Sequence, residues 1–286
     1  MKFLVIGDLH GQKPKIHFKD FDAIIAPGDF CSSDKTRELI FEAIRIRLKN
    51  PKHQINWYNI CGKKKAEKLI KESLKDGRDI LEYLNSFKVP VYLVPGNNDW
   101  VKTSDEKWDY LNKNYYKNII KGLSNLVDVH NQIVDFGDYQ IIGYGLSQGP
   151  EYPQYKIDRK SISKKEFSKR KKEYNKQLTI TSKIFNKSTK PVIFISHNIP
   201  FNTSLDKITY KKSPKYGYHY GSLVARKIIE RYHPIVCIGG HMHEHFNKDK
   251  IGKTTVINSG FGSFVNIWME LRGNKIKKLE FYKGRD

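Results

Sequence analysis

The chain has 286 residues, 38% hydrophobic and 29% charged, and 52 Lys and Arg against 30 Asp and Glu give a formal net charge of +22. This composition excludes a disordered chain, because a protein of this length with 13% aromatic residues can bury a core without disulfides. The charge excess is able to attract polyanions such as nucleic acid or phosphorylated substrates, although solvated lysine-rich faces explain it equally well.

The first part of the chain is predicted to alternate strands and helices. Short β-branched and aromatic runs that end at Gly or Pro predict strands at residues 3–6, 23–26 and 89–94. Apolar residues at helical spacing predict helices at residues 33–50, ended by Pro51, and from 63 to about 87, while 105–121 is helical or irregular. The opening apolar run is too short for a signal peptide, and no run reaches the length of a transmembrane helix, so we expect no membrane association.

The second part adds short strands and a long basic helix. Strands are predicted at residues 126–129, 132–136, 139–143, 192–196, 235–238, 254–258, 261–269 and 275–282, with a hairpin turn at 272–274. One exposed helix is predicted over residues 158–188, with Ser161 and Ser163 before Glu166 as a capping box. A Tyr/Lys/Gly-rich loop at about 202–220 precedes a helix at 221–232.

Strand–helix alternation followed by a β-rich tail indicates an α/β fold with two packed sheets. No linker of Pro, Gly and Ser divides the chain, so we predict one domain over residues 1–286, with basic helical insertions at about 33–88 and 158–188. Three cysteines without CxxC spacing fit a reducing compartment, and we expect a cytoplasmic protein.

Five short polar motifs follow predicted strands: Asp8-Leu9-His10, Gly28-Asp29, Gly96-Asn97-Asn98-Asp99, Ser196-His197-Asn198 and Gly240-His241-Met242-His243. Strand ends in α/β folds bring such side chains to one rim. Residues two apart in an extended segment point to the same side, as in the pairs Asp8/His10 and His241/His243. Carboxylate, imidazole and amide ligands of this kind suit a pair of divalent metal ions.

Each motif alone has an ordinary explanation as a turn or as a hydrogen-bonded histidine. Turns and hydrogen-bonded histidines do not explain why all five motifs occur together in this order, each at the end of a predicted strand. Two aspartates against two dications leave net positive charge, which lowers the pKa of a bridging water and attracts phosphate.

The order of these motifs resembles the calcineurin-like metallophosphoesterases, over residues 8–243, and the later part is similar to small archaeal and bacterial members. The resemblance implies a two-sheet β-sandwich flanked by helices, in four layers α/β/β/α. It implies one metal held by Asp8, His10, Asp29 and His243, and a second held by Asp29, Asn97, His197 and His241. A hydroxide between the two metals, which are Mn, Fe, Zn, Ni or Co in this family, would then attack phosphorus.

The resemblance implies catalytic roles for Asp29, Asn98 and His197, but position 98 departs from the family. Many members have there a histidine that orients the phosphate and protonates the leaving oxygen. Asn98 can donate a hydrogen bond but cannot transfer a proton usefully. If another residue supplies the proton, His219 and His130 are the first candidates, because they belong to none of the five motifs.

The predicted function is hydrolysis of a phosphodiester or a phosphomonoester, with a phosphorylated small molecule or nucleotide as substrate. A nuclease acting on RNA or DNA is an alternative, because Lys63-Lys64-Lys65 and residues 164–176, with Phe167 and Tyr174, are basic. A solvated amphipathic helix explains the second stretch more simply. A catalytically weak interaction scaffold is a further alternative, and the oligomeric state is left open.

Overall fold

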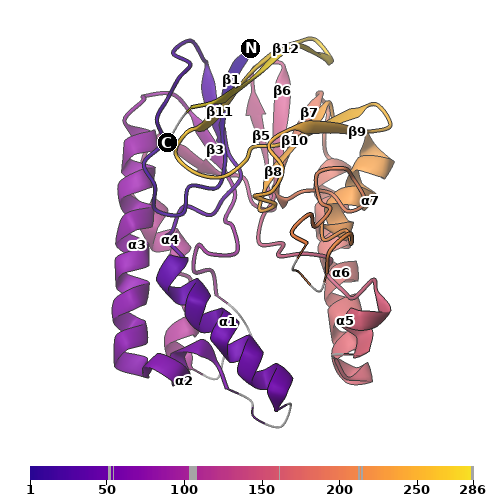
Figure 1. Cartoon of the computed structure of the whole chain (residues 1–286). Helices are drawn as coiled ribbons and strands as arrows, with labels where there is room; N and C mark the ends of the chain where they lie inside the picture. The colour runs from indigo at the N-terminus through magenta and orange to yellow at the C-terminus, as the bar shows by residue number, and fades with distance from the viewer. Residues whose placement is uncertain are drawn as a thin grey trace.

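The computed structural model describes residues 1–50, 53, 55–102, 108–160, 162–211, 213 and 215–284. Two six-stranded mixed sheets pack face to face, with helices on their outer faces (Figure 1), which confirms the predicted α/β fold. The first sheet has the order β12 (Lys275–Lys283), β11 (Val265–Arg272), β1 (Lys2–Ile6), β2 (Ala23–Ala26), β3 (Val91–Leu93) and β4 (Leu126–Asp128). The second has β5 (Ile133–Phe136), β6 (Tyr139–Tyr144), β7 (Val192–Asn198), β8 (Val236–Gly240), β10 (Thr254–Asn258) and β9 (Lys248–Ile251).

The helices cover both sheets and extend past them. They are α1 (Asp34–Lys49), α2 (Trp57–Cys61), α3 (Lys63–Asn85), the 3-10 turn η1 (Asp109–Asn112), α4 (Tyr116–Ile120), α5 (Lys156–Lys160), α6 (Lys164–Phe185) and α7 (Leu223–Tyr232). In Figure 1, α1 to α4 lie on the side of the first sheet and α5 to α7 on the side of the second. Among the residues described, no helix combines the length and the apolar character needed to cross a membrane.

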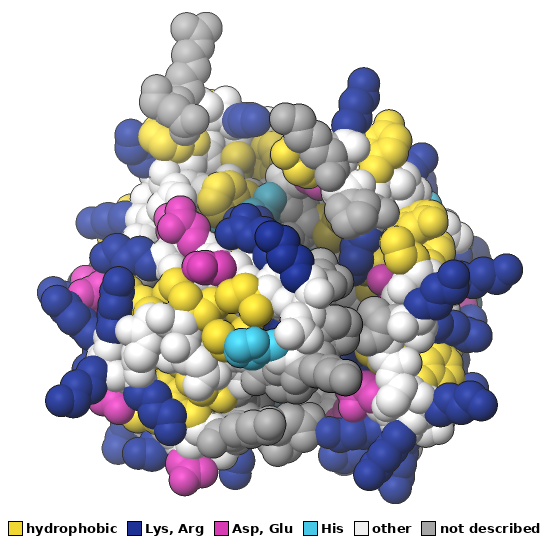
Figure 2. Space-filling model, turned by 60° about the horizontal axis from the view of Figure 1, so that its bottom comes forward, with side chains coloured by type: hydrophobic (Ala, Val, Ile, Leu, Met, Phe, Trp, Pro, Cys, Tyr) yellow, Lys and Arg dark blue, Asp and Glu magenta, His cyan; other side chains and the backbone are white. Residues whose placement is uncertain are grey.

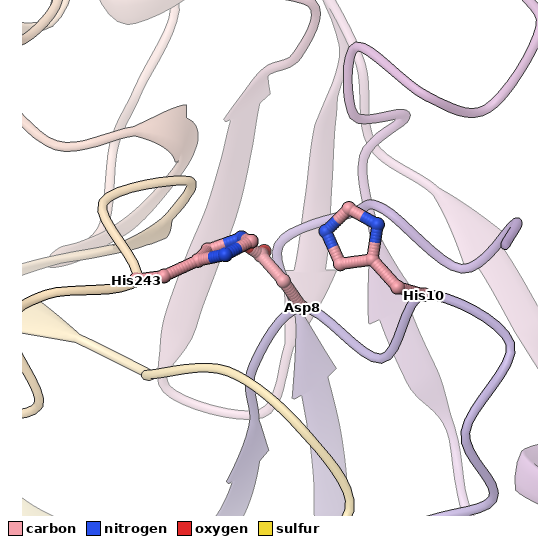
Figure 3. A group of neighbouring side chains, drawn as sticks. All are labelled: Asp8, His10 and His243. Atoms are coloured by element: carbon pink, nitrogen blue, oxygen red, sulfur yellow. The ribbon is translucent and has the colours of Figure 1, made fainter. Parts of the chain in front are cut away.

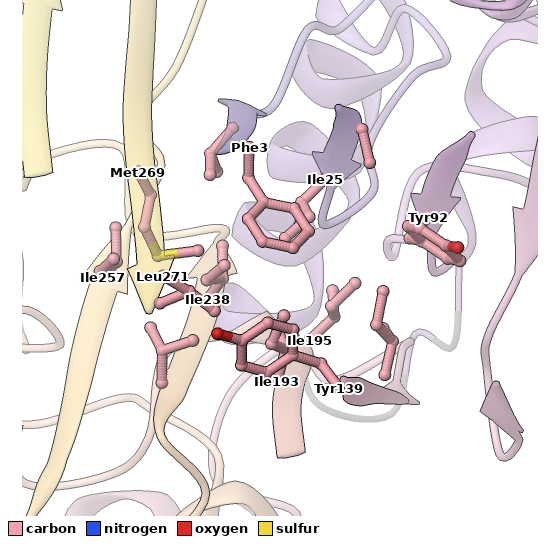
Figure 4. Close-up of a cluster of buried hydrophobic side chains, with 14 of the residues drawn as sticks. Phe3, Ile25, Tyr92, Tyr139, Ile193, Ile195, Ile238, Ile257, Met269 and Leu271 are labelled. Atoms are coloured by element: carbon pink, nitrogen blue, oxygen red, sulfur yellow. The ribbon is translucent and has the colours of Figure 1, made fainter. Parts of the chain in front are cut away.

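Strand β1 shows why the apolar runs are continuous rather than alternating. Phe3 and Val5 belong to the core between the two sheets, and Leu4 and Ile6 to the core between the first sheet and α3. Successive side chains of a strand point to opposite faces, so a strand covered on both faces needs apolar residues at every position. Figure 4 shows the inter-sheet core, to which Ile25 and Ile195 also contribute from opposite sheets.

Parallel pairing sets the position of the site. Strands β1 to β4 pair in parallel, as do β6, β7, β8 and β10, so within each of these runs the carboxyl ends share one edge. The N-terminus lies at the top of Figure 1 beside the start of β1, so β1 ends at the lower edge of its sheet. Helices extend below the sheets on both sides of that edge. They are α1 and α2 on one side, and α5 and the first half of α6 on the other.

Several predicted boundaries were wrong. The single helix predicted over residues 158–188 is two helices, because the chain turns before Ser163, whose hydroxyl caps α6 by accepting from the Glu166 backbone at 3.1 Å. Ser161 lies outside the described residues. Strand β7 continues through Asn198 instead of ending at residue 196, and the strand predicted at 261–269 begins only at Val265. Helix α2 and strand β9 were not predicted.

Candidate metal centre

Two groups of possible metal ligands lie at the lower edge of the sheets. In the first group, Asp8 follows β1, His10 lies two residues on, and His243 follows β8 (Figure 3). Their ligand atoms lie within 4.8 Å of one another. Asp8 Oδ2 is 3.3 Å from His243 Nε2, and the imidazole rings of His10 and His243 meet edge to face with centroids 5.1 Å apart.

The second group contains Asp29, His197 and His241, with ligand atoms again within 4.8 Å of one another. Asn97 joins this group, because its Oδ1 lies 2.9 Å from His197 Nε2 and 2.9 Å from His241 Nδ1. Two atoms bound to one metal at about 2.0–2.2 Å are about 2.8–3.6 Å apart, so these separations fit a shared ion.

Asp29 lies between the two groups. Its Oδ2 is 3.4 Å from His10 Nε2 and 3.7 Å from His197 Nε2. One carboxylate oxygen therefore faces a nitrogen of each group, which is the placement expected of a bridging ligand.

Unpartnered polar atoms support the fit to metal ions. Asp8 Oδ1 and His10 Nε2 are buried without a hydrogen-bond partner among the described residues. Buried polar atoms are nearly always partnered, so atoms left open in this way point to a missing ligand. Imidazole nitrogen with carboxylate and amide oxygen suits borderline divalent metals.

Outer hydrogen bonds orient the rings. His197 Nδ1 donates to the carbonyl of Pro27 at 2.8 Å, so in the neutral ring Nε2 is the nitrogen that can bind a metal. His10 Nδ1 lies 2.9 Å from Ser33 Oγ, so its Nε2 is also the atom turned to the centre. The backbone N–H of His241 donates to the Asp8 carboxylate, which ties the two groups together.

The backbone at the site is strained and tightly packed. His10, Asp29 and His241 have φ values of 44°, 58° and 64°, a region that residues other than glycine seldom adopt. Glycines let the chain approach the carboxylates: a Cβ at Gly96 would lie 2.1 Å from Asp29 Oδ1, and one at Gly240 would lie 2.3 Å from Asp8 Oδ1. The glycines of both motifs are therefore needed for the placement of the ligands.

Burial and the two aspartates set the ionisation of the ligands. Burial lowers the pKa of His10, and burial together with His197 lowers the pKa of His241 to about 4. Burial opposes a charged His197, but Asp29 and Asp8 outweigh it and raise its pKa. Burial would raise the pKa of Asp29, but His197 and His10 lower it overall. The rings of His10 and His241 are thus neutral at pH 7, the form that binds metal.

Asp99 supports the turns that carry the candidate ligands, a role that the sequence motifs do not assign to it. Its carboxylate is fully buried and accepts hydrogen bonds from four backbone N–H groups, those of Asp29 (2.8 Å), Gly96 (2.7 Å), Phe30 (2.8 Å) and Cys31 (3.1 Å). Burial and the charge of Asp29 raise its pKa to about 6. Asp99 thus connects the Gly28-Asp29 turn to the Gly96-Asn97 turn. In the sequence, its position in the same short motif as Asn97 was the only indication of this role.

Asn98 rests on Asp29 rather than facing outward. Its backbone N–H donates to Asp29 Oδ1 at 2.8 Å, and its side-chain amide donates to Asp29 Oδ2 at 2.7 Å. In this position the amide stabilises the charged form of the aspartate.

The two spare histidines differ. His130 is half-buried, accepts from the backbone N–H of Gly145 at 2.9 Å, and has a pKa lowered by burial to about 4, so it is a poor proton donor near neutral pH. His219 lies in the loop before α7, a quarter of its side chain is exposed, and its Nδ1 lies 2.7 Å from the buried carboxylate of Asp206. Its loop contacts the metal-ligand segment, because Lys207 forms a bridge with His219 and accepts from His245 Nε2 at 2.7 Å.

A pocket of about 710 Å³ lies beside the segment that follows β6, and none of the candidate ligands lines it. One wall is the segment 145–150, which is fixed to the metal-ligand turn because Leu146 N–H donates to Pro95 O at 2.9 Å. Basic residues also line the pocket: Lys102, Lys169, Arg170 and Lys215.

The chain is similar to known proteins in sequence and in fold. The chain is 26% identical over 269 residues to the uncharacterized protein MJ1162 of Methanocaldococcus jannaschii, covering 90% of this chain and 87% of that protein. A solved structure matches with a TM-score of 0.61 and 16% identity over 99% of both chains, and TT1561 of Thermus thermophilus matches with a TM-score of 0.50 and 14% identity over 99% and 98%. These two structural similarities concern the fold. The family model described as calcineurin-like phosphoesterase matches residues 1–245, and the chain belongs to that family.

Proposed function

We propose that this protein hydrolyses phosphoesters with two divalent metal ions. Asp8, His10, Asp29 and His243 would hold one ion, and Asp29, Asn97, His197 and His241 the other. The observation that carries the proposal is the meeting of the two groups at Asp29 Oδ2, beside the unpartnered atoms of Asp8 and His10. When bound, such ions stabilise charge on phosphoryl oxygens and lower the pKa of a coordinated water.

A phosphodiester is the substrate class that we favour over a phosphomonoester. A monoester dianion carries more negative charge than a diester monoanion, and Asn98 cannot supply a proton to neutralise it. The net charge of +22 also suits a substrate that is part of a larger polyanion. Membership of the family with a full set of ligand types argues against a scaffold without activity.

The test is hydrolysis of bis(p-nitrophenyl) phosphate by protein stripped with EDTA and reloaded with Mn²⁺, Zn²⁺ or Co²⁺, with metal content measured in parallel. Asp29→Ala removes the shared ligand and should lower the rate by about a thousand-fold, because several kcal/mol of charge stabilisation are lost with the metals. His53→Ala, which changes an exposed histidine, is the control and should keep full activity.

Either of two results would overturn the proposal. One is full activity of Asp29→Ala. The other is a wild-type protein that binds two equivalents of metal and hydrolyses neither bis(p-nitrophenyl) phosphate nor p-nitrophenyl phosphate with any of the three ions.

We further propose that His219 protonates the leaving oxygen. The buried carboxylate of Asp206 holds its Nδ1, and the loop that carries it contacts the segment after His243, which supports a position near the substrate. His219→Asn should slow diphenyl phosphate hydrolysis by about a hundred-fold, the usual contribution of a general acid, and bis(p-nitrophenyl) phosphate much less. Equal slowing of both substrates would show that the residue has only a structural role.

A further inference from the structure

The loop between β7 and α7 presents aromatic side chains to solvent. We name residues 207–211, 213 and 215–220 the tyrosine loop. Its Tyr210, Tyr216 and Tyr218 are 60%, 52% and 36% exposed. Clustered exposed rings of this kind mark a binding surface more often than chance. Lysines lie among them in the sequence, at Lys207, Lys211 and Lys215.

The tyrosine loop is joined to the metal centre on two sides. On one side, Thr209 donates its backbone N–H to Glu244, the residue after His243, and Lys207 accepts from His245. On the other side, Lys215 and Tyr220 line the 710 Å³ pocket together with Leu146, whose backbone N–H donates to Pro95 O, two residues before Asn97. A ligand on the loop could therefore extend into the pocket, toward the turn that carries Asn97.

The chemistry of this surface fits a polyanion with flat rings. Tyr218 already stacks on Tyr155, with centroids 4.3 Å apart and planes within 10°. Among the residues that the structure describes, the rings of Tyr210 and Tyr216 pack against no other aromatic ring. Exposed rings stack on unpaired bases, and lysines contact phosphates. Lysine is depleted from protein–protein interfaces, so a protein partner fits this surface less well.

The surrounding face has the same sign of charge. Figure 2, which brings forward the end of the molecule below the sheets, shows many Lys and Arg side chains around its rim and few Asp and Glu. Helix α6 contributes charge but not rings, because Phe167 and Tyr174 both pack edge-on against Tyr152, at 5.9 and 5.1 Å. Of α6 and the tyrosine loop, only the loop therefore presents rings without an aromatic partner, those of Tyr210 and Tyr216.

We infer that the tyrosine loop and the adjoining pocket bind single-stranded nucleic acid and lead one of its phosphodiesters to the metal centre. This inference rests on the proposed function for the cleavage step, but binding itself does not require the metals. The inference names single-stranded nucleic acid as the substrate class of the metal centre, and it names the tyrosine loop as the part of the basic surface that recognises this substrate.

The experiment measures the affinity of the full chain for a fluorescein-labelled 12-nucleotide thymidine oligomer by anisotropy, in EDTA and across a salt series. Wild-type affinity should fall steeply with salt, because cations on the protein replace counterions on the strand. Tyr210→Ala/Tyr216→Ala should weaken binding by about tenfold or more, given the usual contribution of a stacked base. Phe41→Ala removes a ring that is 49% exposed on α1 and should leave affinity unchanged.

Two further probes separate rings from charge. A 12-base-pair duplex and inorganic polyphosphate should bind more weakly than the single strand and should not respond to the tyrosine substitutions. Equal binding of all three probes, or an unchanged affinity of the double variant, would overturn the inference. Hydrolysis of bis(p-nitrophenyl) phosphate should be normal in the double variant, so a failure of the proposed function and a failure of this inference are distinguishable.

Discussion

The two ligand groups differ in how firmly the protein holds them. In the group of Asp29, Asn97, His197 and His241, the ring of His197 is fully buried and fixed to a backbone carbonyl, and the turns that carry Asp29 and Asn97 are fastened together by Asp99. In the group of Asp8, His10 and His243, the side chain of His243 is 24% exposed and its ring stacks on Phe261 at 4.2 Å. Phe261 itself is 38% exposed.

This difference indicates that the two metals are bound unequally. Ligands already held in position lose less freedom when a metal binds, so we expect the group around His197 to bind the tighter ion. In the group around His243, one ring is 24% exposed and stacks on a neighbour that is itself exposed, so its ion should exchange more readily. Two-site metal titration of the wild-type protein would show two distinct affinities.

Loss of the backbone hydrogen bonds to Asp99 should have a larger effect on stability and metal affinity than any other substitution in this comparison. Asp99→Asn replaces one carboxylate oxygen by an NH₂ group, which faces two backbone N–H groups that then lack an acceptor. At about 1–3 kcal/mol for each unsatisfied group, the free energy of unfolding should fall by about 2–6 kcal/mol. Metal affinity at the group around His197 should fall by up to about a hundred-fold.

Denaturant unfolding in EDTA and calorimetric metal titration measure these two effects. Asp138→Asn, in an exposed turn, is the matched control and should change neither. If Asp99→Asn weakens both metal sites equally, the proposed difference between the groups is wrong.

The sheets and helix α1 were largely predictable from the sequence, and the division between α5 and α6 was not. Strands buried on both faces, such as β2, are short continuous apolar runs bounded by turn residues, a pattern typical of central strands. The break before α6 depends on the turn ahead of Ser163, and helical periodicity alone does not show it, because no residue in the first four turns of this helix is buried. Strand β9 (Lys248–Ile251) has the composition of a polar loop, because it is an edge strand with mostly exposed side chains.

The candidate ligands were predictable by type and spacing, but their supports were not. The seven residues come together because their strands end at the same edge, which an argument from parallel pairing anticipates. The hydrogen bonds that Asp99 accepts and that Asn98 donates to Asp29 depend on backbone geometry, including the positive φ of Asp29. Residue types alone do not reveal this geometry. The pairing of His219 with Asp206 spans 13 residues of loop, a length over which sequence spacing predicts no contact.

The smallest effect should come from Ser33, which supports only the more open group. Ser33 Oγ lies 2.9 Å from His10 Nδ1, and its side chain makes no capping bond to α1 although it precedes that helix. Ser33→Ala should therefore weaken the ion bound by His10 and His243 by about tenfold, the lower end of the range for outer ligands, with little change in stability. Ser32→Ala is the matched control, because its hydroxyl bonds Asp76 instead of a ligand. Calorimetric titration should show the weaker affinity altered and the tighter affinity unchanged; loss at the tighter site would mean that the two groups act as one unit.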